Sequence, residues 1–159
     1  MKNKKGLVMG VANQRSIAWG IAEVLNAEGA SLALTYQGEN FIKRVEPLAE
    51  SIGSTLIFDV DVTDESSIDK CFNHLSKEWE SLDFVVHALA FSDKSELSGR
   101  FINTSRQNFL NSLDIFLILP HQRPRVLNTA GRSLGPTKMI INAAITKYST
   151  PPIPGNILL

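Results

Sequence analysis

The 159-residue sequence has one cysteine, Cys71, and no net formal charge. A single cysteine excludes an internal disulfide and fits a reducing cytosol. Zero net charge gives no general argument for binding nucleic acid or an anionic membrane. No apolar run is long enough to span a bilayer, and the lysine-rich start lacks the hydrophobic segment of a signal peptide. We therefore expect a cytoplasmic protein with no nucleic acid partner, no membrane segment and no metal site.

Acidic residues are missing from the last part of the chain. Residues 1–115 hold eleven Lys and Arg and all sixteen Asp and Glu, whereas residues 116–159 hold five cations and no acid. Six of the seven prolines also lie in residues 116–159. The sequence thus divides into an ordinary globular portion, 1–115, and an atypical proline-rich tail, 116–159. A shift of the reading frame near codon 115 is the simplest hypothesis for this change in composition.

The first portion alternates between apolar runs and helical patterns. Strands are expected at 6–10, 31–36, 55–62 and 83–90. Helices are expected at 16–28 and 40–51, then from an N-cap at Thr63, and from about Thr104. Pro47 lies inside the second helix and predicts a kink. Strands that alternate with helices predict a parallel, doubly wound, Rossmann-like α/β sheet.

The turn from the first strand into the first helix suggests a ligand. Gly10 follows an apolar run, and the helical pattern opens at Ser16. Free backbone N–H groups and the helix dipole favour an anion at such a helix N-terminus, so we predict a nucleotide there rather than a plain turn. The standard fingerprint is absent, because no second glycine occurs before Gly20 and the second strand ends in Tyr36-Gln37 without an acid.

Four segments at suitable spacing carry a more specific resemblance. They are Gly10-x5-Ser16-Ile17-Ala18, Thr35-Tyr36-Gln37, Asp61-Val62 and Val86-His87-Ala88-Leu89-Ala90-Phe91. Over residues 4–115 the chain resembles the bacterial NADH-dependent enoyl-acyl-carrier-protein reductases, divergent short-chain dehydrogenases/reductases. The resemblance implies reduction of the trans-2 double bond of an enoyl thioester on acyl carrier protein, in fatty acid biosynthesis. It also implies a homotetramer.

The resemblance assigns roles to individual residues. Gly10, Ser16 and Ile17 would bind the pyrophosphate, Gln37 the adenosine ribose, and Asp61 and Val62 the adenine. Leu89 and Ala90 would line the cofactor, and Ser92 would contact the substrate. Gln37 brings no cation for the 2′-phosphate of NADP, whereas Arg15 and Lys43 leave that question open. His87 is expected to be a buried, hydrogen-bonded histidine rather than a catalyst.

The family's catalytic pair, a tyrosine followed seven positions later by a lysine, is absent from its expected place after strand five. Tyr148 is followed at that distance by Gly155, and the matching pair Tyr36 and Lys43 falls at the adenosine end. We therefore assign no catalytic residue and expect a truncated, inactive form. The alternatives are another short-chain dehydrogenase, with Ser133 or Tyr148 as the catalytic group, and a non-catalytic NAD(H)-binding module.

The tail gives no regular prediction. Residues 116–119 are compatible with a short strand that Pro120 ends, and residues 137–148 with a helix. Without a fifth strand, the apolar run from Phe84 to Ala90 would be an exposed sheet edge. We accordingly expect low solubility and weak or absent cofactor binding for the chain expressed alone.

Overall fold

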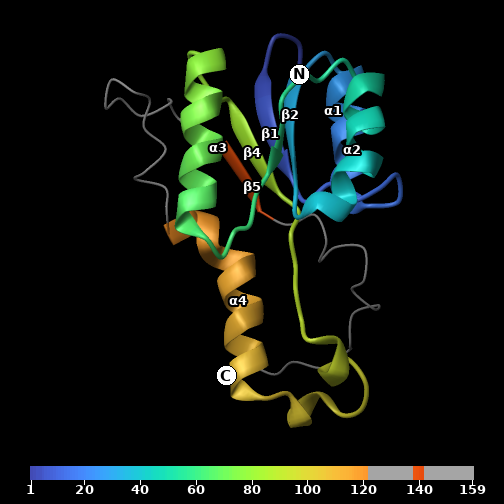
Figure 1. The fold of residues 1–159 in the computed structure, drawn as a ribbon, viewed down its shortest axis with the longest axis vertical. Helices are drawn as coiled ribbons and strands as arrows, with labels where there is room; N and C mark the ends of the chain where they lie inside the picture. Colours follow the sequence, from blue (N-terminus) through green and yellow to red (C-terminus); the bar gives the residue numbers. More distant parts are fainter. Residues whose placement is uncertain (122–137, 142–159) are drawn as a thin grey trace, which may run out of the picture.

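The computed structural model describes residues 1–121 and 138–141 (Figure 1). Five strands form one sheet: β1 Lys5–Met9, β2 Ser31–Tyr36, β3 Ile57–Asp59, β4 Phe84–His87 and β5 Lys138–Ile141. The helices are α1 Ile17–Ala27, α2 Glu39–Ser51, α3 Glu65–Glu78 and α4 Arg106–His121. Two short 3-10 helices, η1 Lys94–Glu96 and η2 Phe101–Asn103, lie between β4 and α4. None of the helices described is both long and apolar enough to cross a bilayer.

The sheet is parallel throughout, in the order β3-β2-β1-β4-β5. This is the doubly wound order of dinucleotide-binding folds, so the predicted fold class is confirmed. Helices α1 and α2 cover one face of the sheet, and α3 covers the other (Figure 1). Alternate residues of β1 point to the two faces: Val8 packs beneath α1 and α2, whereas Leu7 and Met9 pack beneath α3. Apolar residues on both faces explain why β1 reads as a continuous hydrophobic run.

Three local predictions are wrong in detail, and one of them is the fourth strand, which was expected at 83–90 but spans only Phe84–His87. The third strand was expected at 55–62, but β3 ends at Asp59, which pairs with the last residue of β2, Tyr36. Strand β2 ends at Tyr36, so the residues that follow Asp59 have no strand beside them with which to continue the pairing. The N-cap of α3 is Asp64 rather than Thr63, because the Asp64 carboxylate accepts from the Ser66 amide at 2.9 Å. Pro47 lies within α2, which continues to Ser51.

The tail also departs from expectation. Residues 116–119 belong to α4 rather than to a strand, and Pro120 falls in the last turn of that helix. Residues 138–141 form β5 rather than the start of a helix, and they pair in parallel with β4, from Phe84 with Lys138 to His87 with Ile141. Strand β4 is therefore an inner strand. This removes the exposed edge from which low solubility and weak cofactor binding were expected. Tyr148 and the rest of 142–159 lie outside the described residues.

Candidate functional site

The predicted site residues converge on the carboxyl ends of four neighbouring strands. Gly10 follows β1, Gln37 follows β2, Asp61 lies two residues after β3, and Leu89 lies two residues after β4. These strands stand side by side in the order β3-β2-β1-β4. Ligands of doubly wound sheets bind in the crevice outside the carboxyl ends of the strands. The fold thus brings segments distant in sequence to the edge where a dinucleotide would lie.

Gly10 turns the chain out of β1 in a conformation that side chains disfavour. Its φ is +93°, and a Cβ built on it would lie 2.7 Å from the carbonyl oxygen of Ala88. Thr35 fixes the same turn from the other side. Its carbonyl oxygen accepts from the amides of Val11 at 2.9 Å and Gly10 at 3.2 Å. Glycine is therefore needed because β4 and β2 hold the turn closely on both sides.

Ser16 caps α1 and organises the turn before it. Its Oγ donates to the carbonyl of Asn13 at 2.7 Å and accepts from the amides of Ala12 and Trp19, each at 3.4 Å. Within the described part of the chain, no acceptor is found for the amides of Ile17 and Ala18. Two unpaired donors at the positive end of a helix suit phosphate oxygens, so this N-terminus fits the pyrophosphate of a dinucleotide.

Asp61 lies next to Gln37 at the ends of β3 and β2. Its Oδ1 accepts from the Thr63 hydroxyl at 2.7 Å and the Thr63 amide at 2.8 Å. These bonds lower the pKa of the Asp61 carboxyl below its usual value; partial burial opposes them and a hydrogen bond from the Gln37 side chain adds to them. Asp61 is therefore an ionised acceptor beside Gln37. The fold pairs the two residues assigned to adenine and ribose.

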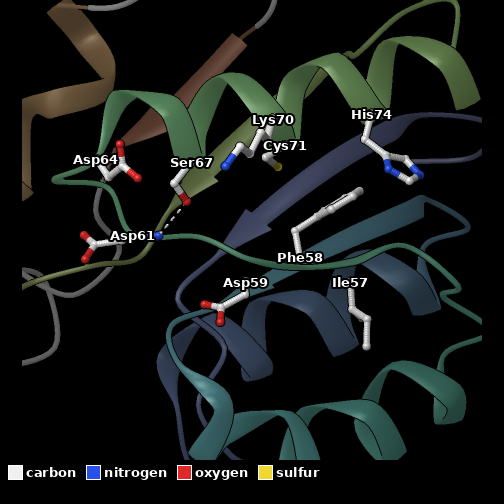
Figure 2. A pocket seen from close by; sticks show the side chains of 9 residues that line it. All are labelled: Ile57, Phe58, Asp59, Asp61, Asp64, Ser67, Lys70, Cys71 and His74. Atoms are coloured by element: carbon white, nitrogen blue, oxygen red, sulfur yellow. Dashed lines mark hydrogen bonds between the residues drawn. The ribbon is translucent and has the colours of Figure 1, made fainter.

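A pocket of about 590 Å³ extends from Asp61 along the groove between β3 and α3 (Figure 2). Asp61 and Asp64 lie at one end, and Phe58 and His74 lie at the other. The Asp61 amide donates to Ser67 Oγ at 3.0 Å, which ties the loop after β3 to α3. Val62 does not line this pocket, because its side chain is buried in the core beneath α3. Only its backbone remains available to a ligand.

Beyond β4 the chain passes from core to surface. Leu89 is half-buried against the α3 core, and Ala90 and Phe91 are exposed. Ser92 is held by Asn108 of α4, whose Nδ2 donates to Ser92 Oγ at 3.1 Å and to Glu96 at 3.2 Å. The Asn108 Oδ1 also accepts from the Asp93 amide at 2.8 Å. With only 5% of its surface exposed, Asn108 is a buried clamp on the segment that carries Ser92.

His87 is buried as predicted but has no hydrogen-bond partner. It is 1% exposed, and neither ring nitrogen finds a partner among the described residues. The expected burial is therefore confirmed, whereas the only candidates for the expected hydrogen bonds, in the described part of the chain, are the backbone groups of His87 and Ile115, which lie near the ring without meeting strict hydrogen-bond geometry. Burial lowers the pKa of the imidazole, and the nearby backbone of His87 and Ile115 acts weakly in the opposite direction. The ring is thus held neutral in the sheet, away from the exposed loops.

Tyr36 and Lys43 do not make a catalytic pair in this fold. Tyr36 packs in the core beneath α1 and α2, and burial, with the charges of Asp59, Glu46 and Glu39, raises its pKa. A tyrosine that donates a proton near neutral pH needs the opposite shift. Lys43 is exposed on α2 and lines a pocket to which Tyr36 does not contribute.

Two residues that the structure places at the site were not singled out from the sequence. Thr35 was part of a quoted motif, but its bonds to the β1–α1 turn come from a neighbouring strand. Asn108 reaches Ser92 across sixteen residues of chain, and a polar residue on a helix gives no periodic signal. Only the pairing of strands and the docking of α4 reveal either contact.

The comparisons with known proteins agree with this geometry. The sequence model of the family described as "Enoyl-(Acyl carrier protein) reductase" matches residues 10–147. The matched region therefore extends beyond residue 115, where we expected the resemblance to stop. The chain is 50% identical over 138 residues to an NADH enoyl-acyl-carrier-protein reductase of Rhizobium meliloti, covering 84% of this chain and 51% of that protein. It is 50% identical over 115 residues to the FabI of Rickettsia typhi, and this match covers 72% of this chain and 44% of that protein.

Solved structures give the same result. An enoyl-acyl-carrier-protein reductase of Anaplasma phagocytophilum, solved in complex with NAD, superposes with a TM-score of 0.73 at 51% identity, covering 79% of this chain and 50% of that one. The reductase of Aquifex aeolicus superposes with a TM-score of 0.74 at 39% identity. The superposition covers 79% of this chain and 49% of that one. The chain spans about half the length of the curated relatives it matches, 51% and 44% for the two above.

Proposed function

Since the chain belongs to the enoyl-(acyl carrier protein) reductase family, we propose that it forms the NADH-binding part of a reductase acting on enoyl thioesters of acyl carrier protein. The observation that carries this proposal is the convergence of the β1–α1 turn, Gln37 and Asp61 at the ends of adjacent strands. The relatives described above are named as NADH enzymes, and the reductase of Anaplasma phagocytophilum was solved with NAD bound.

Each end of the cofactor has residues suited to it. The amides of Ile17 and Ala18 and the Ser16 hydroxyl would bind the pyrophosphate. Gln37 would bind the adenosine ribose, and Asp61 would accept from the adenine amino group. Leu89 and Ala90 would line the nicotinamide half and Ser92 would contact the thioester, with Asn108 fixing its position. Bound NADH would supply a hydride, and the residues named above would hold and orient the cofactor and the thioester.

These 159 residues contain no tyrosine–lysine pair after β4 at the family's spacing. We therefore propose that the chain by itself binds NADH without reducing an enoyl thioester, because no acid stands ready to protonate the developing enolate. The family match continues past residue 115 to residue 147, which argues against a frame shift near codon 115 as the origin of the tail's composition. The single, buried Cys71 supports a cytoplasmic location.

Titration with NADH, with and without a trans-2-enoyl thioester, tests the proposal. We expect saturable NADH binding and no loss of reduced-nicotinamide absorbance when the thioester is added. Asp61→Asn should weaken NADH about tenfold, while Asp69→Asn on the exposed surface of α3 should leave it unchanged. Absence of binding would refute the cofactor site. Turnover of the thioester would refute the inactive form, and oxidation of an alcohol with NAD would favour another short-chain dehydrogenase.

A further inference from the structure

A network of hydrogen bonds fixes the orientation of the Asn108 side chain at the start of α4. A carboxamide has two ends of different chemistry, an oxygen that accepts and an NH2 group that donates. The Asn108 Oδ1 accepts from the Asp93 amide at 2.8 Å. The Asn108 Nδ2 donates to Glu96 Oε2 at 3.2 Å. Because an amide N–H cannot accept and a carboxylate cannot donate, both partners require the same orientation of Asn108.

Glu96 is ionised near neutral pH and therefore acts as an acceptor. Its Oε2 also accepts from the Ser105 amide at 2.8 Å. Hydrogen bonds from the backbone and side chain of Ser105, and more weakly one from Asn108, lower the pKa of the Glu96 carboxyl, while desolvation and the charge of Asp93 act in the opposite direction. The NH2 group of Asn108 is consequently held on the side that faces Glu96, by a hydrogen bond to a charged acceptor.

This orientation makes the Ser92 hydroxyl an acceptor within the network. Asn108 Nδ2 also donates to Ser92 Oγ, at 3.1 Å. Ser92 Oγ and Asn108 Oδ1 are 3.4 Å apart, beyond the about 2.5–3.0 Å of a good O–H···O bond. Within the described part of the chain, no other acceptor is found for this hydroxyl. The Ser92 proton therefore remains available to a partner outside the network.

The position of Ser92 allows that partner to be a ligand. Ser92 is half-buried, and it follows the exposed residues Ala90 and Phe91 on the chain that leaves the carboxyl end of β4. Asn108 is only 5% exposed, so its polar atoms face the network rather than solvent. A buried amide that supports a half-buried hydroxyl is suited to directing one hydrogen bond.

We propose that Asn108 and Glu96 are positioning residues that turn the Ser92 proton outward, so that Ser92 donates to the carbonyl oxygen of the enoyl thioester. The proposal rests on the proposed function, which places the thioester against Ser92. It adds a direction to that contact. Ser92 acts as a donor, and it therefore favours a substrate that has an acceptor oxygen at this point.

Titration of the chain, in the presence of NADH, with crotonyl pantetheine and with the crotyl thioether of pantetheine tests the direction of this bond. The thioether lacks the thioester carbonyl and is otherwise matched. Ser92→Ala should weaken the thioester about fivefold and leave the thioether within about twofold, because only the thioester offers the acceptor. Equal losses for the two ligands, or no loss for the thioester, would overturn the proposal.

Variants of Asn108 separate its effect on the Ser92 proton from its effect on stability. Asn108→Asp replaces the Nδ2 donor by an acceptor, so the Ser92 proton should turn inward and the thioester should bind about fivefold more weakly. Adding Glu96→Gln removes the repulsion between two carboxylates and should restore stability in urea unfolding, but not thioester affinity. Recovery of both would overturn the proposal. The matched control, Asn111→Asp, keeps its Oδ1 acceptor for Gln107 and should change neither.

NMR of the unliganded chain gives an independent readout. Because each Nδ2 proton of Asn108 has its own acceptor, Ser92→Ala should mainly shift one of the two side-chain amide resonances, and Glu96→Ala the other. Shifts of the same proton, or of neither, would overturn the assigned orientation. Binding of NADH without binding of the thioester would overturn the donor role of Ser92 alone. Failure of NADH to bind would overturn the proposed function, and this readout would still test the orientation.

Discussion

Gly10 and Ala88 approach so closely that a Cβ on Gly10 would lie 2.7 Å from the Ala88 carbonyl oxygen. The first residue after β1 is therefore held against the first residue after β4. The φ of +93° at Gly10 adds a second reason why no side chain is tolerated. This contact shapes the turn that leads to the N-terminus of α1, so it links the packing of the sheet to the proposed cofactor site.

Gly10→Ala should destabilise the chain by at least about 2 kcal/mol, because it adds both backbone strain and overpacking. Gly20→Ala is the matched control. Gly20 lies within α1 with no atom within 4 Å of a built Cβ, so alanine there should stabilise by about 0.5–1 kcal/mol. Urea unfolding measures both. Similar midpoints for the two variants would show that the contact between Gly10 and Ala88 is not the constraint described.

Ser16 combines a structural role with a proposed binding role, and three variants separate them. Ser16→Ala should cost about 1 kcal/mol through loss of the cap, whereas Ser16→Gly should cost only a few tenths. Both remove the hydroxyl, so both should weaken NADH to the same extent, and Ser16→Thr should retain most of the affinity. Urea unfolding measures the capping role of Ser16, and NADH titration measures its binding role. If affinity follows stability across the three variants, the hydroxyl acts only as a cap.

His87 should make stability depend on pH. Its pKa is lowered in the folded state, so the unfolded chain binds more protons as the pH falls below about 6.5, and the free energy of unfolding decreases. Above that range its contribution is fully present. His87→Leu should flatten the dependence between pH 5 and 8 in urea unfolding. His74→Gln, on the exposed surface of α3, is the control and should preserve it. A His87→Leu profile that matches wild type would contradict the assignment.

Much of the fold was predictable because the signals are local. The strand at 31–36 appears at its expected bounds, and the N-cap of the third helix lies within one residue of the expected one. The failures are non-local. Strand β5 depends on pairing with a strand far earlier in the chain, and its four residues carry no signal of their own. Residues 116–119 are uniformly apolar, a pattern that fits a buried strand as well as a helix.

For the candidate site, too, local signals were predictable and non-local contacts were not. Ser16 and Gln37 were found from motifs in sequence, and the fold brings their segments to one edge of the sheet. The roles of Thr35 and Asn108 could not be found in that way, because their partners lie on other elements.

Asn108 should control the order of the segment that carries Ser92. Asn108→Ala removes the bonds to Ser92, Asp93 and Glu96, and leaves buried polar groups unpaired, at a cost of about 1–3 kcal/mol. Amide exchange in residues 92–105 should become faster. Asn111→Ala, an exposed residue of α4 that bonds only to Gln107 among the residues described, should change neither stability nor exchange. Unaltered exchange in Asn108→Ala would remove its role as a clamp.

The account's central claim is that NADH binds across the carboxyl ends of β1, β2 and β3. At 17.5 kDa the chain is suited to residue-resolved NMR, and an NADH titration followed by amide chemical shifts tests the claim most directly. The account predicts saturable shifts at the amides of Ile17, Ala18, Gln37 and Asp61, with little change at Lys77 on the outer surface of α3. Unchanged shifts at Ile17 and Ala18 at saturating NADH, or shifts confined to other parts of the chain, would contradict it.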